Sequence, residues 1–232
     1  MLFLVSGILF AGGKEEQRFS DAHFALGTVC TITLCGRSNE AAFKGAFDLV
    51  DEIESKMSVS IAGSEVGLIN KAAGSAPVIV SGETFFVIEE SLKYSALSDG
   101  AFDITVQPLV DLWGIGTEFA QIPSTVEIES AVDLVGYRDV EMNRRDSSVF
   151  LNRTGMAVDL GGIAKGYATD RVKDYFLDLS FKTGILNFGG NIVTFGRKSG
   201  GDPWVIGIQD PFDSRGKPIG TVEFSGGAVV TS

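Results

Sequence analysis

The segment 156–167, MAVDLGGIAKGY, combines an aspartate, a glycine pair and a lysine where a predicted strand gives way to a helix. Glycines after Asp159 allow a ligand to approach the backbone, and the free N–H groups of a helix N-terminus bind anions. Lys165 falls in the first helical turn, where a cation opposes the helix dipole, and such a broken rule is typical of a binding site. The segment therefore predicts a phosphate site. The alternative is that the glycines only permit close packing and that Lys165 is solvated.

A second polar pattern lies in the segment 99–114. Apolar Phe102, Ile104 and Val106 alternate with residues that carry oxygen, namely Asp103, Thr105 and Gln107. Alternation with a period of two predicts an extended strand with its oxygen atoms on one face. This face is interpreted either as part of a binding site or as the solvated side of a half-buried strand.

Two weaker patterns also contain chemistry-bearing residues. The segment 184–191 is an apolar strand that ends in a glycine pair flanked by Asn187 and Asn191, and it predicts either backbone lying against a ligand or a bulge. The segment 64–70 follows the first predicted helix and is typical of a helical turn capped by Ser64.

The elements that position these segments follow from hydrophobic periodicity. Helices are predicted from Ser38 or Asn39 to Met57, from about Glu83 to Leu97, from the capping box at Ser124 and Glu127 to just before Gly136, and after Gly162. Strands are predicted at 24–34, around 140, and at 149–151, 184–195, 204–209, 221–224 and 228–231. The elements interleave without regular βαβ alternation, which predicts a mixed α+β domain rather than a doubly wound sheet.

Composition and charge exclude several classes of protein. The 232 residues are 44% hydrophobic and 21% charged, as in globular domains, and the net charge of −11 disfavours nucleic acid as a partner. His23 is the sole histidine, which excludes His-rich zinc sites and argues against a Ser-His-Asp triad. Cys30 and Cys35 lie five positions apart in a predicted strand, so we expect no disulfide between them.

The N-terminal segment 1–20 is expected to be signal-like or flexible. Its apolar run at 2–11 is too short to span a bilayer and is typical of the later part of a secretory signal, although a basic start is missing. Gly13 stands where a bacterial lipoprotein signal would have its lipidated cysteine, so membrane anchoring is not assigned. We expect an exported protein; a frayed or buried apolar terminus is the alternative.

Taken together, the segments resemble the FAD:protein FMN transferase family, the ApbE-like flavin transferases. The resemblance runs from about residue 24 to residue 232 and keeps the order of the family's motifs. The matching stretches are 25–28, 64–70, 100–114, 158–167 and 187–191. It implies an ApbE or T-fold-like domain over 21–232, with a largely antiparallel sheet and flanking helices.

The resemblance also implies an activity. Family members use Mg²⁺ and FAD. A threonine hydroxyl of an acceptor protein, typically a membrane redox subunit, takes the FMN while AMP leaves. For this protein the resemblance implies a location on the periplasmic side of the inner membrane. Some relatives use water instead and hydrolyse FAD to FMN and AMP. By matching positions, Ala101, Phe102 and Asp103 would contact the flavin nucleotide. Asp159 and Lys165 would hold FAD, and the carbonyl of Gly162 would bind magnesium; no catalytic side chain is assigned.

Three departures from the family pattern qualify this resemblance. Leu26 stands where a methionine usually lies near the flavin, and Ser60 stands where many relatives have a tyrosine beside the flavin. The family's later region, which supplies further magnesium ligands, has no counterpart before Ser232. We therefore expect a C-terminally truncated flavin transferase. The alternatives are a non-catalytic flavin-binding exported protein and an inactive, degenerate remnant.

Overall fold

A five-stranded sheet runs through the larger part of the protein. The structure, a computed structural model, describes residues 17–198, 201–214 and 216–231. The order of the sheet is β1-β2-β6-β7-β10, and every neighbouring pair is antiparallel. Its strands are β1 (Arg18–Ala25), β2 (Thr28–Cys35), β6 (Gly184–Phe188), β7 (Asn191–Phe195) and β10 (Gly227–Val230).

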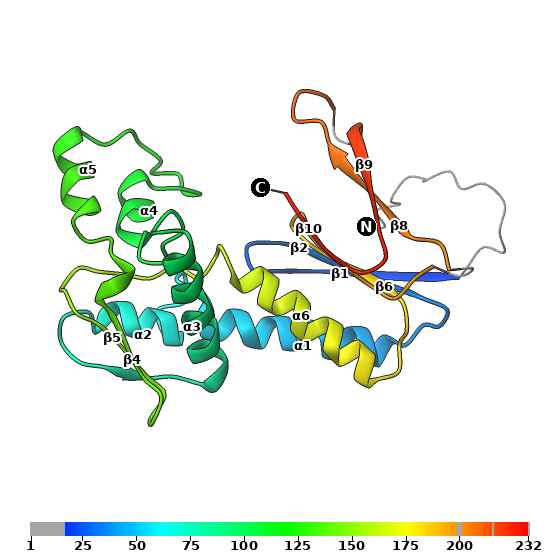
Figure 1. Cartoon of the computed structure of the whole chain (residues 1–232), viewed down its shortest axis with the longest axis horizontal. Coiled ribbons are helices and arrows are strands. Elements are labelled where there is room, and N and C mark those ends of the chain that lie inside the picture. Colours follow the sequence, from blue (N-terminus) through cyan, green and yellow to red (C-terminus); the bar gives the residue numbers. More distant parts are fainter. Residues whose placement is uncertain (1–16, 199–200, 215, 232) are drawn as a thin grey trace.

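Two long helices, α1 (Glu40–Met57) and α6 (Ala164–Asp178), lie side by side against this sheet (Figure 1). Phe176 of α6 is fully buried, and its ring meets Phe43 of α1 and Phe181 edge-on at centroid distances of 6.4 and 5.5 Å. It also stacks on Phe195 of β7 at 6.4 Å. Because apolar positions recur every three or four residues on both helices, each buries one stripe in this shared core.

The remaining helices gather beside the end of α1 with a three-stranded antiparallel sheet of order β3-β5-β4, on the left of Figure 1. The helices are α2 (Glu65–Lys71), α3 (Gly82–Leu97), α4 (Gln107–Trp113), α5 (Thr125–Val132) and the 3-10 turn η1 (Tyr137–Asp139). The strands are β3 (Val78–Ile79), β4 (Val140–Asn143) and β5 (Ser148–Leu151).

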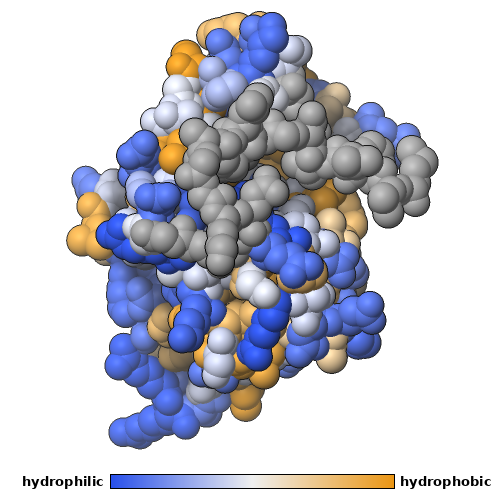
Figure 2. Space-filling view, turned by 90° about the vertical axis from the view of Figure 1, so that its right-hand side faces the viewer, coloured by the Kyte–Doolittle hydropathy of each residue, from blue (hydrophilic) through white to orange (hydrophobic). Residues whose placement is uncertain are grey.

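A two-stranded ribbon, β8 (Trp204–Gln209) and β9 (Pro218–Phe224), projects from the five-stranded sheet (Figure 1). Most of β9 is exposed on both faces. Figure 2 shows the adjacent side of the molecule, where hydrophilic residues cover most of the surface that is not grey and apolar residues form smaller areas between them. No helix in the described part of the chain is long and apolar enough to cross a membrane.

The structure confirms the α+β fold class and most of the predicted elements. Asn39 caps α1, Ser64 caps α2, and both bonds of the capping box between Ser124 and Glu127 are present at the start of α5. Cys30 and Cys35 are both buried and form no disulfide with each other, as expected. The signal-like run 2–11 and Gly13 lie outside the described residues, and β1 already begins at Arg18, inside the segment expected to precede the domain.

Two of the predicted strands are hairpins. The stretch predicted as one strand over 24–34 turns at Leu26 and Gly27, whose φ angles are 53° and 69°. Leucine rarely adopts this left-handed conformation, which costs about 1–2 kcal/mol, so its residue type did not indicate a turn. The stretch 184–195 likewise turns at Gly189 and Gly190, which both have positive φ.

Two other predicted strands are absent. Residues 102–107 form a turn leading into α4, because the Asp103 carboxylate bonds to the Thr105 N–H and Pro108 favours a helix start. Thr105 and Gln107 are buried, so the predicted solvated face does not exist. The apolar stretch before Asp159 is extended but forms a single parallel bridge, Ala157 to Val106.

Candidate functional site

The glycine corner, defined here as residues 159–163, connects the smaller sheet to α6. The backbone N–H of Asp159 donates to the carbonyl of Ile104 at 2.7 Å, and Ala157 pairs with Val106. The two segments singled out in the sequence therefore lie side by side, although more than fifty positions separate them. Because these contacts join the two backbones, they fix the position of Phe102 relative to the corner.

Asn70 of α2 holds the approach to the glycine corner. Its side-chain oxygen accepts the N–H of Val158 at 2.7 Å, and its nitrogen donates to the Val158 carbonyl at 3.0 Å. Val158 and Leu160 are fully buried, whereas Gly161 and Gly162 are exposed. The corner is thus held by the buried side chains of Val158 and Leu160 and by the two hydrogen bonds of the Asn70 amide, while its glycines remain accessible to solvent.

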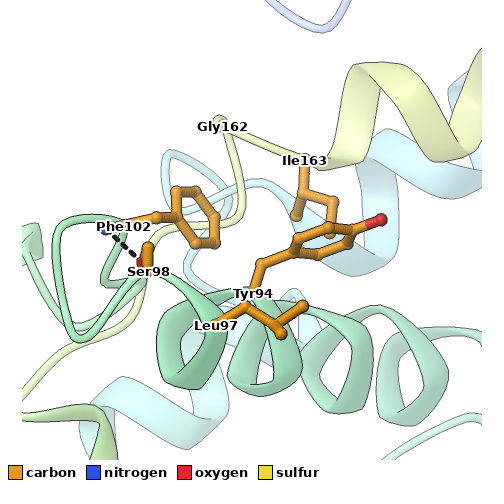
Figure 3. Close-up of a pocket in the computed structure, with 6 residues that line it drawn as sticks. All are labelled: Tyr94, Leu97, Ser98, Phe102, Gly162 and Ile163. Atoms are coloured by element: carbon orange, nitrogen blue, oxygen red, sulfur yellow. Dashed lines mark hydrogen bonds between the residues drawn. The ribbon is translucent and has the colours of Figure 1, made fainter.

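An apolar pocket of about 410 Å³ opens on one side of the glycine corner. We call it the Phe102 pocket; it is lined by Tyr94, Leu97, Ser98, Phe102, Gly162 and Ile163. In Figure 3 the rings of Phe102 and Tyr94 lie on opposite sides of this space, and Leu97 and Ile163 complete the apolar lining. Two aromatic rings and two aliphatic side chains suit a planar aromatic ligand.

Gly162 is a glycine for a reason that the structure shows. A Cβ atom added there would lie 3.0 Å from Cε2 of Phe102, closer than most real contacts. The aromatic ring therefore rests directly against the backbone of the corner, and any side chain at Gly162 would push it away.

A second pocket of about 250 Å³ lies on the other side of Gly162, between the start of α6 and strands β7 and β10. We call it the Lys165 pocket; its polar lining comes from Lys165, Thr169, Asp170 and the buried Asn191. Lys165 Nζ donates to the Gly161 carbonyl at 3.1 Å. The N-terminus of α6 has no side-chain cap at Ile163, unlike those of α1, α2, α3 and α5. An uncapped helix N-terminus beside a lysine is suited to an anion.

The predicted acidic residues have specific contacts. Asp159 Oδ1 accepts the Gly161 N–H at 2.7 Å, which shapes the corner. Asp103 accepts hydrogen bonds at both oxygens: Oδ1 from the Thr105 N–H and hydroxyl at 2.8 and 2.6 Å, and Oδ2 from the Tyr137 N–H at 2.8 Å. Asp103 therefore holds the loop that carries Phe102, and it lines neither pocket.

Three other predicted contact residues lie outside the linings of both pockets. Leu26 is in the β1–β2 turn, half-buried against the core. Ser60 is exposed in the connection between α1 and α2, and Ala101 is exposed just before Phe102. The structure thus brings Phe102, Gly162 and Lys165 together at the pockets, with Asp159 in the corner between them.

The glycine corner presents oxygen donors of the kind that bind magnesium. The corner offers the Asp159 carboxylate and exposed backbone at Gly162, and oxygen atoms are the donors that Mg²⁺ prefers. No group of three His, Cys, Asp or Glu residues that could hold a metal occurs among the residues described. The donors fit an ion that takes its other ligands from phosphate and water, as Mg²⁺ commonly does.

A cluster of charged residues surrounds Glu83 at the start of α3, and Tyr167 connects it to the helix that follows the glycine corner. Hydrogen bonding to Lys56 lowers the pKa of Glu83, although its partial burial opposes this. Burial alone would lower the pKa of Lys56, but its bonds with Glu52 and Glu83 raise that pKa to about 12. Burial, together with the nearby Glu83 charge, raises the pKa of Tyr167 to about 12. Glu83 and Lys56 are therefore both charged at neutral pH, and Tyr167 is a neutral hydrogen-bond donor.

Sequence reasoning missed the walls contributed by α3. Tyr94 and Leu97 line the Phe102 pocket and are 56% and 81% exposed. Large apolar residues that fall off the buried stripe of a helix are the signal that could have identified them. Asn191 is part of the segment 184–191 singled out in the sequence, but its place in the Lys165 pocket depends on the β6–β7 hairpin.

An antiparallel sheet backed by two helices carries an aromatic pocket and an anion-suited pocket that meet at a glycine pair, and this arrangement suits a ligand that joins a planar ring to an anionic group. Comparison with known proteins makes the class specific. Residues 26–232 match the ApbE family, and the chain belongs to that family.

The relatives carry the same enzyme name. An FAD:protein FMN transferase of Klebsiella pneumoniae is 37% identical over 219 residues, covering 94% of this chain and 67% of that protein. One from Treponema pallidum is 29% identical over 250 residues, covering all of this chain and 69% of that protein. The chain thus spans about two thirds of the length of these relatives and belongs to a family of enzymes.

Solved structures agree with the fold. The ApbE protein of Thermotoga maritima superposes with a TM-score of 0.86 at 34% identity, covering 93% of this chain and 70% of that one. The flavin transferase ApbE of Vibrio cholerae gives a TM-score of 0.79 at 27% identity, covering 85% and 65%. The expected ApbE-like fold is confirmed.

Proposed function

We propose that this protein transfers FMN from FAD to a threonine hydroxyl of an acceptor protein and releases AMP, with Mg²⁺ as the metal. The observation that carries the proposal is the meeting of the Phe102 and Lys165 pockets at Gly162. FAD joins planar aromatic rings to a diphosphate, and the two pockets offer an aromatic surface next to a lysine and an uncapped helix N-terminus.

The reaction balances as a substitution at phosphorus. The acceptor oxygen forms a bond to the phosphorus on the FMN side, the bond from that phosphorus to the bridging oxygen breaks, and AMP leaves with the electron pair. The hydroxyl proton passes to a base that we do not assign. Bound Mg²⁺, held by Asp159 and the Gly162 carbonyl, would neutralise charge on the diphosphate and on the departing AMP.

The chain's own residues bind and orient the substrate. Phe102 and Tyr94 provide the faces against which the isoalloxazine ring stacks. Lys165 exchanges its 3.1 Å bond to Gly161 for a diphosphate oxygen, and the free N–H groups of α6 add further donors. Leu26, Ser60, Ala101 and Asp103 are proposed to act near the flavin as the family resemblance implies, Asp103 by holding the Phe102 loop.

The acceptor and the location are part of the same proposal. We propose a membrane redox subunit as acceptor and an exported protein facing the periplasmic side of the inner membrane, as the resemblance and the signal-like run at 2–11 imply. A proteinaceous acceptor is consistent with the exposure of the glycine corner, since a bulky hydroxyl donor must reach the phosphorus.

FAD hydrolysis is the same reaction with water in place of the threonine hydroxyl. A second candidate function is flavin binding without turnover. It is favoured by two observations: Ser60 is exposed and contributes no aromatic ring, and the described residues contain no cluster of three metal-ligating side chains. Both features reduce the number of groups available to hold FAD and magnesium.

One experiment separates these functions. The purified protein is incubated with FAD, with and without Mg²⁺, and with and without a threonine-containing acceptor protein, and AMP is measured by chromatography. AMP that depends on metal and acceptor, together with flavin fluorescence on the denatured acceptor, supports transfer. AMP and FMN without acceptor support hydrolysis, and flavin retained without AMP supports binding alone. Absence of all three rejects the proposal.

A further inference from the structure

Tyr167 ends the motif that begins at the glycine corner, but it lines neither pocket. Its ring is half-buried, and its hydroxyl donates to Glu83 Oε1 at 3.1 Å. Its ring also lies 6.0 Å from that of Phe86, centroid to centroid. Tyr167 thus joins α6 to α3 by a polar and an aromatic contact.

Glu83 receives groups from two further positions. Lys56, in the last turn of α1, contacts Oε2 at 2.7 Å, and Arg171 of α6 lies 3.5 Å from Oε1. The Glu83 side chain is 26% exposed, so solvent only partly screens these charges. A single carboxylate therefore connects the three helices α1, α3 and α6.

This connection joins α3 and α6, which both contribute residues to the Phe102 pocket. The spacing i, i+3 and i+11 places Glu83, Phe86 and Tyr94 on one stripe of α3. Tyr94, a wall of the pocket, lies about 16 Å from Glu83 along the helix axis. On α6, Tyr167 stands one turn after Ile163, which lines the same pocket.

The backbones of α3 and α6 do not pack along each other as those of α1 and α6 do. Besides the buried stripe of α3 in the core, the side-chain contacts of Glu83 and Phe86 with α6 therefore contribute to the spacing of the pocket walls. A change in the Glu83 contacts would tilt α3 relative to α6, and the displacement would be felt at Tyr94 and Leu97, at the far end of α3.

We propose that Glu83, through Tyr167, Arg171 and Lys56, is a positioning residue that holds the walls of the Phe102 pocket at the separation needed for the flavin ring of FAD. This inference rests on the proposed function, because it concerns the same pocket. Glu83 touches neither pocket itself, so its effect is on affinity rather than on the bond-making step.

The test compares three variants with the wild-type protein. Glu83→Gln removes the charge but keeps the shape, and Tyr167→Phe removes only the hydroxyl. Glu89→Gln is the matched control, because Glu89 is on the same helix, has a similar exposure of 24%, and pairs with Arg144 at 2.7 Å, away from α6. FAD affinity is measured by flavin fluorescence, the KM and kcat of AMP release by chromatography, and the melting temperature by calorimetry.

We expect Glu83→Gln to weaken FAD binding about 3- to 10-fold and to raise KM more than it lowers kcat. Tyr167→Phe should give a smaller loss, and the double variant should lose less than the product of the two single effects, since both act through one contact. Glu89→Gln should lower the melting temperature to a similar degree while leaving FAD affinity within twofold of wild type.

An unchanged FAD affinity in Glu83→Gln, or an equal loss in Glu89→Gln, overturns the inference while the proposed function stands. If Glu83→Gln does not fold, Tyr167→Phe decides: weaker FAD binding supports the inference and unaltered binding overturns it. A wild-type protein that binds no FAD overturns the proposed function and this inference with it.

Discussion

Replacement of Gly162 by alanine tests whether the Phe102 pocket is the flavin site. The added Cβ would lie 3.0 Å from Cε2 of Phe102, so the ring must move by a few tenths of an ångström. The φ angle of Gly162 is not in the left-handed region, so the backbone accepts alanine and the effect is on the ring. Loss of the stacking contact would cost about 0.5–1.5 kcal/mol, which is about a 2- to 13-fold weaker affinity for FAD.

The control is Gly82→Ala at the first position of α3, where an added Cβ meets nothing within 4 Å. It should leave FAD affinity unchanged and raise stability slightly, since alanine favours the helix. Affinity is measured by titrating each protein with FAD at fixed magnesium and following flavin fluorescence, with melting temperatures in parallel. If Gly162→Ala binds FAD as tightly as wild type, the ring does not stack on flavin in this pocket.

Three further predictions follow from the contacts at the site. Lys165→Gln should weaken FAD binding about tenfold and reduce its dependence on salt, measured by titration at two ionic strengths, while stability stays equal or rises because a cation leaves the N-terminal turn. Asn70→Ala should cost about 2–3 kcal/mol in urea unfolding, because both backbone groups of Val158 lose their partner. Since contact with Lys56 lowers the pKa of Glu83, the stabilisation it provides is present above the ordinary glutamate pKa and is lost as pH falls through the lowered value. The difference in melting temperature between wild type and Glu83→Gln should therefore be constant near neutral pH and shrink in acid.

The sequence predicts α1, α3, α5 and α6 well because their signals are local, whereas α4 was not predicted. Caps such as Asn39 and the Ser124–Glu127 box are bonds between residues three positions apart, and the apolar stripe of α1 repeats within one element. The turn at Leu26 was missed for the opposite reason: its left-handed φ is imposed by pairing of β1 with β2, which no local property of leucine reveals.

The site was only partly predictable for a related reason. Gly162 and Lys165 break local rules for an ordinary helix start, and this made them visible. Asp103 has the residue type of a ligand contact, but its partners at Tyr137 and Thr105 take up both oxygens, and a partner thirty-four positions away cannot be seen in a pattern. Tyr94 and Leu97 line the pocket only because the glycine corner, more than sixty positions later in the chain, packs beside them at Gly162 and Ile163.

Local groups rather than net charge decide whether this protein accepts an anion. A charge of −11 repels a dinucleotide at long range, but at physiological salt fields from surface charges decay over about 8 Å. Within that distance of the glycine corner stand the Lys165 ammonium and the uncapped N-terminus of α6. The Asp159 carboxylate opposes them, yet it is the donor type that Mg²⁺ prefers, so bound metal would reverse its contribution from repelling phosphate to holding it. In the proposed function the Asp159 carboxylate and the anionic FAD are therefore compatible through the metal, and we expect a fluorescence titration to show weaker FAD binding when Mg²⁺ is removed.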